Sequence, residues 1–506
     1  MRLFQVHGID ERGKAVLRKQ LRRAQVAVFF GNLPPCVIGM EACASAHHWA
    51  RTLHRFGHTV RLMAPQFVKP YVKTNKNDVA DAEAICEAVG RPSMRFVPIK
   101  SIEQQAILSV HRLKIRLLPC FGALILVPAV VSAGVVGPGL YRNDAGQRIY
   151  VGVEVEVPAA AVNQYFDPRT RHTGDLRPDE HLSLLKGIEE EPRIIDSPNG
   201  QLAASLYYVG SGRRATIILI HGNDPETREM GFIIPYFVLN GVNVISYDQR
   251  GTGRSAGNWQ QNGPTERATD VAAIYDEFVT DPHVIRESLG LWGFSNGGWT
   301  APIVATTRPV AFMILKSGPA ESIEENVYYS VEQHMRQKHY DAAAISSAID
   351  TWHSLIGALS GALSWDAART MYTAASTKSW FADSYIPFFI PPNPDVPPPA
   401  AAAEALRREI LYDPATTLQQ VHTPTLALFG ALDRNVDVAH SPTLFKSAFA
   451  RAGMHDFTMH IYKDAGHTLK VSATGFNDEP SQPEQLTAGY PGVMIQWLRQ
   501  RNFLLN

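Results

Sequence analysis

Gly293-Phe294-Ser295-Asn296-Gly297-Gly298 is the most informative part of this sequence. It follows the apolar run 288–292 (SLGLW) and precedes a helix-like segment, 299–307. Glycines two residues before and two residues after Ser295 let the backbone turn sharply enough to place Oγ at the tip of the turn. The helix N-terminus behind the serine favours developing negative charge. Gly-x-Ser-x-Gly between a strand and a helix therefore predicts a nucleophile elbow.

The residues that would complete a catalytic triad follow downstream, the acid first and then the histidine. Residues 424–430 (PTLALFG) read as a buried strand that leads to Asp433, and residues 455–463 (HDFTMHIYK) alternate like a strand that leads to His467. We expect His467 to take the proton from Ser295 and Asp433 to hold the imidazole in the required tautomer. Asp437 is a rival for the acid, but it lies further from the strand, so Asp433 is preferred.

A third strand supplies the expected oxyanion hole. Residues 215–220 (ATIILI) form a continuous apolar run into His221-Gly222-Asn223. We expect the backbone N–H of Asn223 and that of Asn296, directly after the nucleophile, to bind the oxyanion. The imidazole of His221 is expected to serve as scaffold.

With these motifs in this order, residues from about 190 to the C-terminus resemble the α/β-hydrolase superfamily, in its serine-esterase and prolyl-oligopeptidase-like branch. Residues 244–255 (VISYDQRGTGRS) are similar to that family's strand and loop before the nucleophile, and the resemblance covers roughly 310 of the 506 residues. It implies an enzyme that cleaves an ester or amide bond through an acyl-enzyme intermediate. The substrate would be a small-molecule ester or a peptide-like compound, and no metal or organic cofactor is required.

The order of expected elements fits this fold class. Strand candidates alternate with helical stretches, which predicts an α/β fold with a mostly parallel central sheet. Residues 142–190 are polar and are expected to be an N-terminal extension of the hydrolase domain, 191–506. The segment from about 321 to 410 interrupts the alternation: it is helical, then aromatic, then Pro-rich, and is expected to form a cap over the active site.

The N-terminal part carries a different likeness. Residues 39–43 (GMEAC), 47–51 (HHWAR), 63–71 (MAPQFVKPY) and 73–82 (KTNKNDVADA) resemble a bacterial insertion-sequence transposase of the DEDD type, over about residues 1–112. That family has an RNase-H-like fold and holds Mg²⁺ with four acidic residues. Glu41, Asp78 and Asp81 fall on three of these positions, and the family's first aspartate would lie upstream of Met1. We therefore expect an incomplete, vestigial fragment with no bound metal and no functional nucleic-acid partner.

Charge supports a junction between the two parts. Residues 1–116 contain 19 Lys and Arg but 8 Asp and Glu, a net charge of +11. The whole chain carries 48 of each kind, so the remaining residues have a net charge of −11. The overall neutrality hides two oppositely charged parts, and the basic part suits a nucleic-acid-binding ancestry.

Between them lies an apolar segment, residues 117–141, that contains no charged residue. About 20 apolar residues suffice to span a bilayer, and Lys114 and Arg116 precede the run, so we expect a signal anchor or transmembrane segment. The positive charge before it predicts a hydrolase domain outside the cytoplasm, in the bacterial periplasm or at the cell surface. The alternative is a buried hairpin or helix in a cytoplasmic protein. All four cysteines precede residue 121, so no disulfide framework is expected in the hydrolase part.

Two alternatives for function stay open at this point. One is an inactive transposase–hydrolase chimaera, and the other is a non-catalytic binding protein with the hydrolase fold. The complete serine, acid and histidine set argues against the non-catalytic binding protein.

Overall fold

The computed structural model describes the following residues: 3–10, 14–22, 26, 29–31, 33–41, 46, 49–50, 53, 58–63, 68, 78–91, 94, 96–97, 136–155, 161–176, 180–259, 263–389, 404, 407–476 and 484–504. The chain divides into two compact units, Met1–Ala129 and Val130–Asn506. Each unit is described by itself below.

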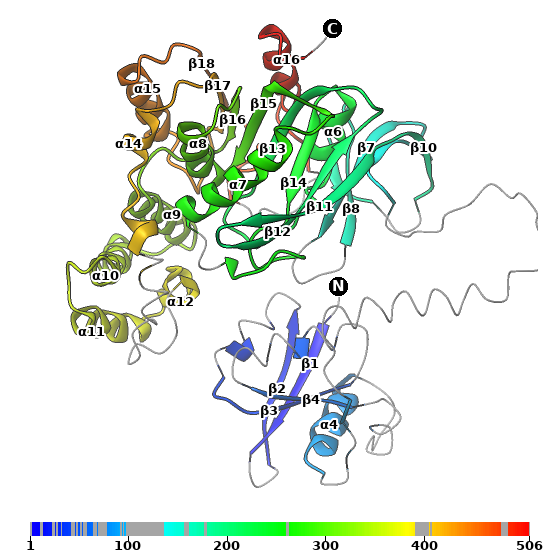
Figure 1. Ribbon diagram of the computed structural model, residues 1–506. Helices are drawn as coiled ribbons and strands as arrows, with labels where there is room; N and C mark the ends of the chain where they lie inside the picture. The colour runs from blue at the N-terminus through cyan, green and yellow to red at the C-terminus, as the bar shows by residue number, and fades with distance from the viewer. Residues whose placement is uncertain are drawn as a thin grey trace, which may run out of the picture. The chain divides into compact units, whose positions relative to one another are not determined.

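In the first unit, β1 (Leu3–Ile9) and β2 (Ala15–Arg22) form an antiparallel hairpin, while β3 (Val37–Glu41) runs parallel to β4 (Thr59–Met63). The short β5 (Phe96–Val97) pairs antiparallel with β4. Helix α4 (Asp78–Val89) packs closely on β3, because a Cβ at Gly39 would lie 2.8 Å from the Cβ of Val89. Glycine at position 39 therefore sets how near the helix lies to the strand. Figure 1 shows α4 beside the strands of this unit.

An eight-stranded sheet forms the centre of the second unit. Its strands, in spatial order, are β11 (Glu189–Ser197), β12 (Gly200–Tyr208), β14 (Asn243–Tyr247), β13 (Arg214–Ile220), β15 (Val284–Phe294), β16 (Met313–Lys316), β17 (Thr425–Gly430) and β18 (Phe457–Tyr462). β11 and β12 pair antiparallel, and β12 is also antiparallel to β14, whereas every pairing from β14 to β18 is parallel. The predicted α/β fold with a mostly parallel sheet is confirmed.

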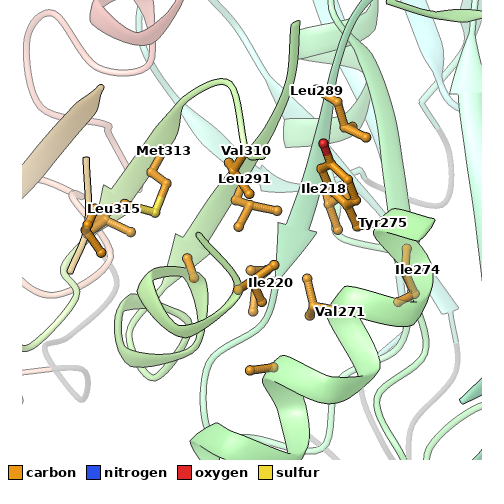
Figure 2. Close-up of a cluster of buried hydrophobic side chains, with 14 of the residues drawn as sticks. Ile218, Ile220, Val271, Ile274, Tyr275, Leu289, Leu291, Val310, Met313 and Leu315 are labelled. Atoms are coloured by element: carbon orange, nitrogen blue, oxygen red, sulfur yellow. The ribbon is translucent and has the colours of Figure 1, made fainter. Parts of the chain in front are cut away.

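Both faces of this sheet are covered by helices, because its inner strands are apolar on both sides. Along β13, Ile218 and Ile220 face one core, and Ile217 and Leu219 face the other. Helices α7 (Pro264–Phe278), α8 (Gly297–Thr307) and α15 (Ser441–Arg451) cover the first face, with the short α14 (Pro414–Leu418) at its margin. Figure 2 shows this core, in which Val271, Ile274 and Tyr275 of α7 meet the strands. Helices α6 (Ile233–Leu239) and α16 (Gly492–Gln500) cover the second face.

The expected N-terminal extension is a second sheet. Five antiparallel strands lie in the order β10 (Leu182–Gly187), β6 (Gly139–Asn143), β7 (Arg148–Val155), β8 (Ala161–Phe166) and β9 (Thr173–Asp175). β6 crosses the boundary expected between residues 141 and 142, and Tyr141 is buried within this sheet. Phe166 of β8 packs into the second core of the hydrolase, so the small sheet is part of the same unit.

The membrane prediction requires a correction. Residues 117–135 lie outside the described residues, but residues 139–141 begin strand β6, which pairs with β7 and β10. In the part of the chain that the structure describes, no helix combines the length and apolar character needed to cross a bilayer. The prediction of a transmembrane helix over 117–141 is therefore wrong, since one continuous helix cannot include residues of a strand. An apolar run alone does not distinguish a helix from a buried strand.

Between β16 and β17 the chain forms the expected helical insertion, called the cap here. It contains α9 (Ile323–Gln337), α10 (Ala342–Ser360), α11 (Trp365–Ser376), the 3₁₀ turn η4 (Phe381–Asp383) and α12 (Ile386–Phe389). Figure 1 shows these helices grouped together beside the central sheet. They share an apolar core of their own, centred on Trp352, Leu355 and Tyr372. The aromatic side chain of Trp380 also packs in this core.

Candidate active site

Ser295 lies in a sharp turn between β15 and α8, with φ of 51°. This left-handed conformation is uncommon for a residue with a side chain and marks strained backbone. The flanking glycines make the turn possible: a Cβ at Gly293 would lie 2.4 Å from the carbonyl oxygen of Gly297, and one at Gly297 would lie 2.7 Å from that of Ile220. The turn is held to the next strand because the N–H of Ser295 donates to the carbonyl of Lys316 at 3.0 Å.

The structure brings His467 and Asp433 together. Nδ1 of His467 lies 2.8 Å from Oδ2 of Asp433, and the two residues are 6% and 2% exposed. The other carboxylate oxygen of Asp433 accepts the N–H groups of Asn435 at 2.8 Å and Val436 at 3.0 Å. A carboxylate is an acceptor at neutral pH, so Nδ1 carries the proton and Nε2 is left as the basic nitrogen.

Asp437, the rival acid, lies elsewhere. Its Oδ1 accepts the N–H groups of Ala439 at 2.9 Å and His440 at 3.2 Å, directly before helix α15. An Asp side chain that accepts N–H groups two and three residues further on stabilises a turn, here the one that precedes the helix. Within the described residues, the imidazole of His467 has its carboxylate partner in Asp433 and not in Asp437.

His467 is next to the elbow. Its ring lies 5.1 Å from that of Phe294, the residue before the nucleophile, and its carbonyl accepts the hydroxyl of Ser317 at 2.7 Å. Among the described residues, no hydrogen bond joins the Ser295 hydroxyl to His467. Such bonds are often long without substrate and shorten in the complex.

The loop 221–223 lies against the nucleophile. A Cβ at Gly222 would lie 3.5 Å from the Cβ of Ser295, and the Asn296 side-chain amide donates to Oδ1 of Asn223 at 2.9 Å. In the described residues, the backbone N–H groups of Asn223 and Asn296 have no acceptor within the protein. Two free donors near Ser295, one of them at the N-terminus of α8, could stabilise a negatively charged oxygen placed there.

A buried arginine supports this loop. Arg267 of α7 is 4% exposed, and its guanidinium donates to the carbonyl of Gly222 at 2.6 Å and to Oδ1 of Asn223 at 3.4 Å. Burial lowers the pKa of Arg267 from its ordinary value, although Glu409 and other nearby acids oppose this. Sequence reasoning missed this residue, since a single arginine in a helix gives no sign that it faces a loop 44 residues away.

His221 holds the same loop from the other side. Its Nε2 lies 2.6 Å from the carbonyl of Tyr247, and its Nδ1 lies 3.2 Å from a carboxylate oxygen of Glu226. Burial acts to raise the pKa of Glu226, but the nearby His221, the N–H of Gly222 and the guanidinium of Arg267 together outweigh burial, and the pKa is lowered. His221 therefore contacts a carbonyl and a carboxylate of the scaffold, as a structural residue would.

Lys316 lies behind the elbow. Its Nζ is 4.4 Å from the ring centre of Phe294, 5.5 Å from that of Tyr490 and 5.8 Å from that of Trp292. Burial, assisted by the positive charge of Lys470, lowers the pKa of Lys316 to about 7. The Phe294 ring therefore has an ammonium group and the imidazole of His467 as neighbours.

The acidic residues of the first unit are described only in part. Glu41 is exposed at the end of β3, and Asp78 and Asp81 lie in the first turn of α4. In the described residues, one group could in principle hold a metal ion: Glu191, Asp281 and His283. The guanidinium of Arg193 already lies between the two carboxylates and pairs with both, so it neutralises the charge a cation would need.

Comparison with known proteins agrees with this geometry. Residues 211–362 match the family model Hydrolase_4, described as serine aminopeptidase, S33. The matched range includes Asn223, Ser295 and Asn296, whereas Asp433 and His467 follow it. The match bears out the prediction of an α/β-hydrolase enzyme, and residues 211–362 are similar to serine hydrolases of this family.

The N-terminal part is similar to a probable family 20 transposase of Pseudomonas aeruginosa. The two are 63% identical over 122 residues, which make up 24% of this chain and 36% of that protein. The chain thus spans about a third of the length of this relative, and the predicted transposase-like fragment is confirmed.

Two solved structures resemble the chain at low identity. An acylaminoacyl peptidase of Pyrococcus horikoshii is 15% identical with a TM-score of 0.37, and the match covers 63% of this chain and 44% of that one. An esterase of Pyrococcus furiosus is 14% identical with a TM-score of 0.36, and the match covers 54% of this chain and 81% of that one.

Proposed function

We propose that the second unit hydrolyses an ester or amide bond through a covalent acyl-enzyme formed on Ser295. The observation that carries the proposal is the hydrogen bond between His467 Nδ1 and Asp433, with the imidazole against Phe294, the residue before a serine in a strained turn. A base oriented by a buried carboxylate next to a nucleophile is the arrangement that activates a hydroxyl group.

In this mechanism, Nε2 of His467 takes the proton as Ser295 Oγ attacks the carbonyl carbon of the substrate. The tetrahedral intermediate places its negative oxygen near the N–H groups of Asn223 and Asn296. His467 then gives the proton to the leaving alcohol or amine. Water attacks the acyl-enzyme with His467 again acting as base, and Ser295 is regenerated.

The substrate class follows from the family and the site. A small-molecule ester or a peptide-like amide fits, since the matched family is described as a serine aminopeptidase and no step requires a metal or organic cofactor. The alternative of a non-catalytic binding protein gains no support, because such a protein has no need for a buried acid–histidine pair beside a serine.

The test is active-site labelling together with turnover. Wild-type protein should react with a fluorophosphonate probe and hydrolyse p-nitrophenyl esters or aminoacyl amides. Ser295→Ala should abolish labelling and reduce kcat by on the order of 10⁴ to 10⁶. Ser376→Ala, which removes an exposed hydroxyl on α11, is the matched control and should behave as wild type. Ester hydrolysis retained by Ser295→Ala would reject Ser295 as the nucleophile.

A further inference from the structure

One face of the cap helix α9 is bonded to the loop that carries Asp433. Four polar side chains share this face, at spacings of three, four and seven residues: Asn326, Tyr329, Ser330 and Gln333. Positions with these spacings lie one above another on a helix. All four bond to residues 433–435, called the acid loop here.

The bonds reach the backbone on both sides of Arg434. The hydroxyl of Tyr329 donates to the carbonyl of Asp433 at 3.0 Å. The carbonyl of Asn435 accepts two bonds, from the Asn326 amide at 2.8 Å and from the Ser330 hydroxyl at 3.0 Å. The guanidinium of Arg434 completes the set by donating to Gln333 at 3.2 Å.

The beginning of α9 is fixed firmly. A reciprocal capping box joins Ser322 and Glu325. The carboxylate of Glu321, the buried residue just before the box, accepts hydrogen bonds from the Ser441 hydroxyl and, at 3.0 Å, from the Asn326 amide. The carbonyl of Glu321 also accepts the indole N–H of Trp299 in α8, the helix that follows the nucleophile. The start of α9 therefore connects the acid loop to α8, the helix that follows Ser295.

Tyr329 keeps its proton under ordinary conditions. Burial and the nearby carboxylates of Asp437 and Asp433 raise its pKa to about 12. The hydroxyl therefore acts as a donor, and its acceptor is the carbonyl of the residue whose carboxylate orients His467. Because that carbonyl and that carboxylate belong to one residue, fixing the carbonyl fixes the backbone position from which the carboxylate reaches His467.

We propose that α9 positions the catalytic acid, with Tyr329 as the positioning residue that acts through Asp433. The inference rests on the proposed function, since it assigns Asp433 its role in orienting His467. It predicts that the cap contributes to the chemical step. A purely structural role for Tyr329 would instead affect stability and leave the Asp433–His467 hydrogen bond unchanged.

Tyr329→Phe tests this, since it removes only the hydroxyl. We expect kcat to fall roughly three- to tenfold, the effect of one neutral hydrogen bond, with KM unchanged. Tyr328→Phe is the matched control: its hydroxyl bonds to Glu324 and His353 within the cap and should not affect kcat. A loss of kcat shared equally by both variants would overturn the inference.

A double-mutant cycle asks whether Tyr329 acts through Asp433. Asp433→Asn alone should lower kcat by about 10⁴. If Tyr329 works through this carboxylate, Tyr329→Phe should cause no further loss in the Asp433→Asn background. Independent, multiplying losses would contradict the proposal.

A readout without turnover separates this inference from the proposed function. The Nδ1 proton of His467 should give a downfield NMR resonance, because it is bonded to a buried carboxylate. Tyr329→Phe should shift this resonance and Tyr328→Phe should not, whether or not a substrate is cleaved. An unshifted resonance in Tyr329→Phe would reject α9 as a positioning element, while a shifted one in a protein without activity would reject only the hydrolase assignment.

Discussion

At the scale of single residues, Lys316 shows how burial changes the behaviour of a side chain. An amine on a flexible stem usually lies in water, but this one is surrounded by the rings of Phe294, Trp292 and Tyr490. Aromatic faces attract an ammonium group, yet burial is the larger effect and lowers the pKa from 10.5 to about 7. Folding therefore disfavours the charged form of Lys316.

The dependence of stability on pH follows from this shift. Between about pH 7 and 10.5, the unfolded chain holds a proton on Lys316 that the folded chain has lost, so the free energy of unfolding rises with pH in this window. Lys316→Met keeps the length of the side chain and removes the titration. We expect it to raise stability most below pH 7, and the difference from wild type to shrink as the pH approaches 10.

Urea unfolding at pH 6 and pH 9 measures this effect. The difference between wild type and Lys316→Met should be smaller at pH 9 than at pH 6. The exposed Lys446→Met on α15 is the control, and its difference from wild type should stay constant. An equal effect of Lys316→Met at both pH values would contradict the lowered pKa.

At the scale of elements, the sequence was most informative where backbone geometry restricts residue choice. The elbow could be predicted because glycine is required at positions 293 and 297, where a Cβ would meet carbonyl oxygens. The sheet could be predicted because fully buried parallel strands are continuous apolar runs. Both signals are local in the sequence.

Contacts between distant elements could not be predicted in this way. The polar face of α9 resembles an ordinary solvated face in the sequence, and its partners lie more than 100 residues downstream. The small sheet β6–β10 was also missed, because its strands have weak patterning: most residues of β10 are exposed, while Ile149 and Val151 of β7 are buried. In the same way, the last residues of the apolar run 117–141 form a strand.

Replacing Gly297 with alanine tests the geometry of the elbow as an element. The added Cβ would lie 2.7 Å from the carbonyl of Ile220 and 3.1 Å from that of His221, so backbone must move. A shift of about 1 Å in the nucleophile can cost roughly 100-fold in kcat. Gly212→Ala, where a Cβ meets nothing within 4 Å, should retain wild-type kcat. Wild-type turnover in Gly297→Ala would show that the elbow tolerates the displacement.

At the scale of the whole molecule, the chain is two units of different kinds. The compact division falls between Ala129 and Val130, and the hydrolase unit includes the five-stranded sheet. Strand β6 lies inside that sheet, between β10 and β7. The position at which the chain is shortened should therefore decide whether the hydrolase folds.

Two truncations test this. A chain that begins at Val130 should fold and keep its hydrolase activity. A chain that begins at Asp144 lacks β6, so the buried Ile149 and Val151 lose a covering strand, at about 1.5–3 kcal/mol for each side chain. Thermal unfolding should show a lower Tm for the second chain. Equal Tm values would mean that β6 contributes nothing to the unit.

Exchange of the cap of this chain for a foreign one would break the hydrogen bonds between α9 and the acid loop. The cap is one continuous insertion between β16 and β17, so a single segment of the gene encodes it, called the cassette here. Yet the acceptors for helix α9 are the carbonyls of Asp433 and Asn435, which follow β17 and lie outside that cassette. A foreign cap would leave both carbonyls without their donors. A foreign cap would therefore need a matching acid loop, which a second, separate segment of the gene encodes.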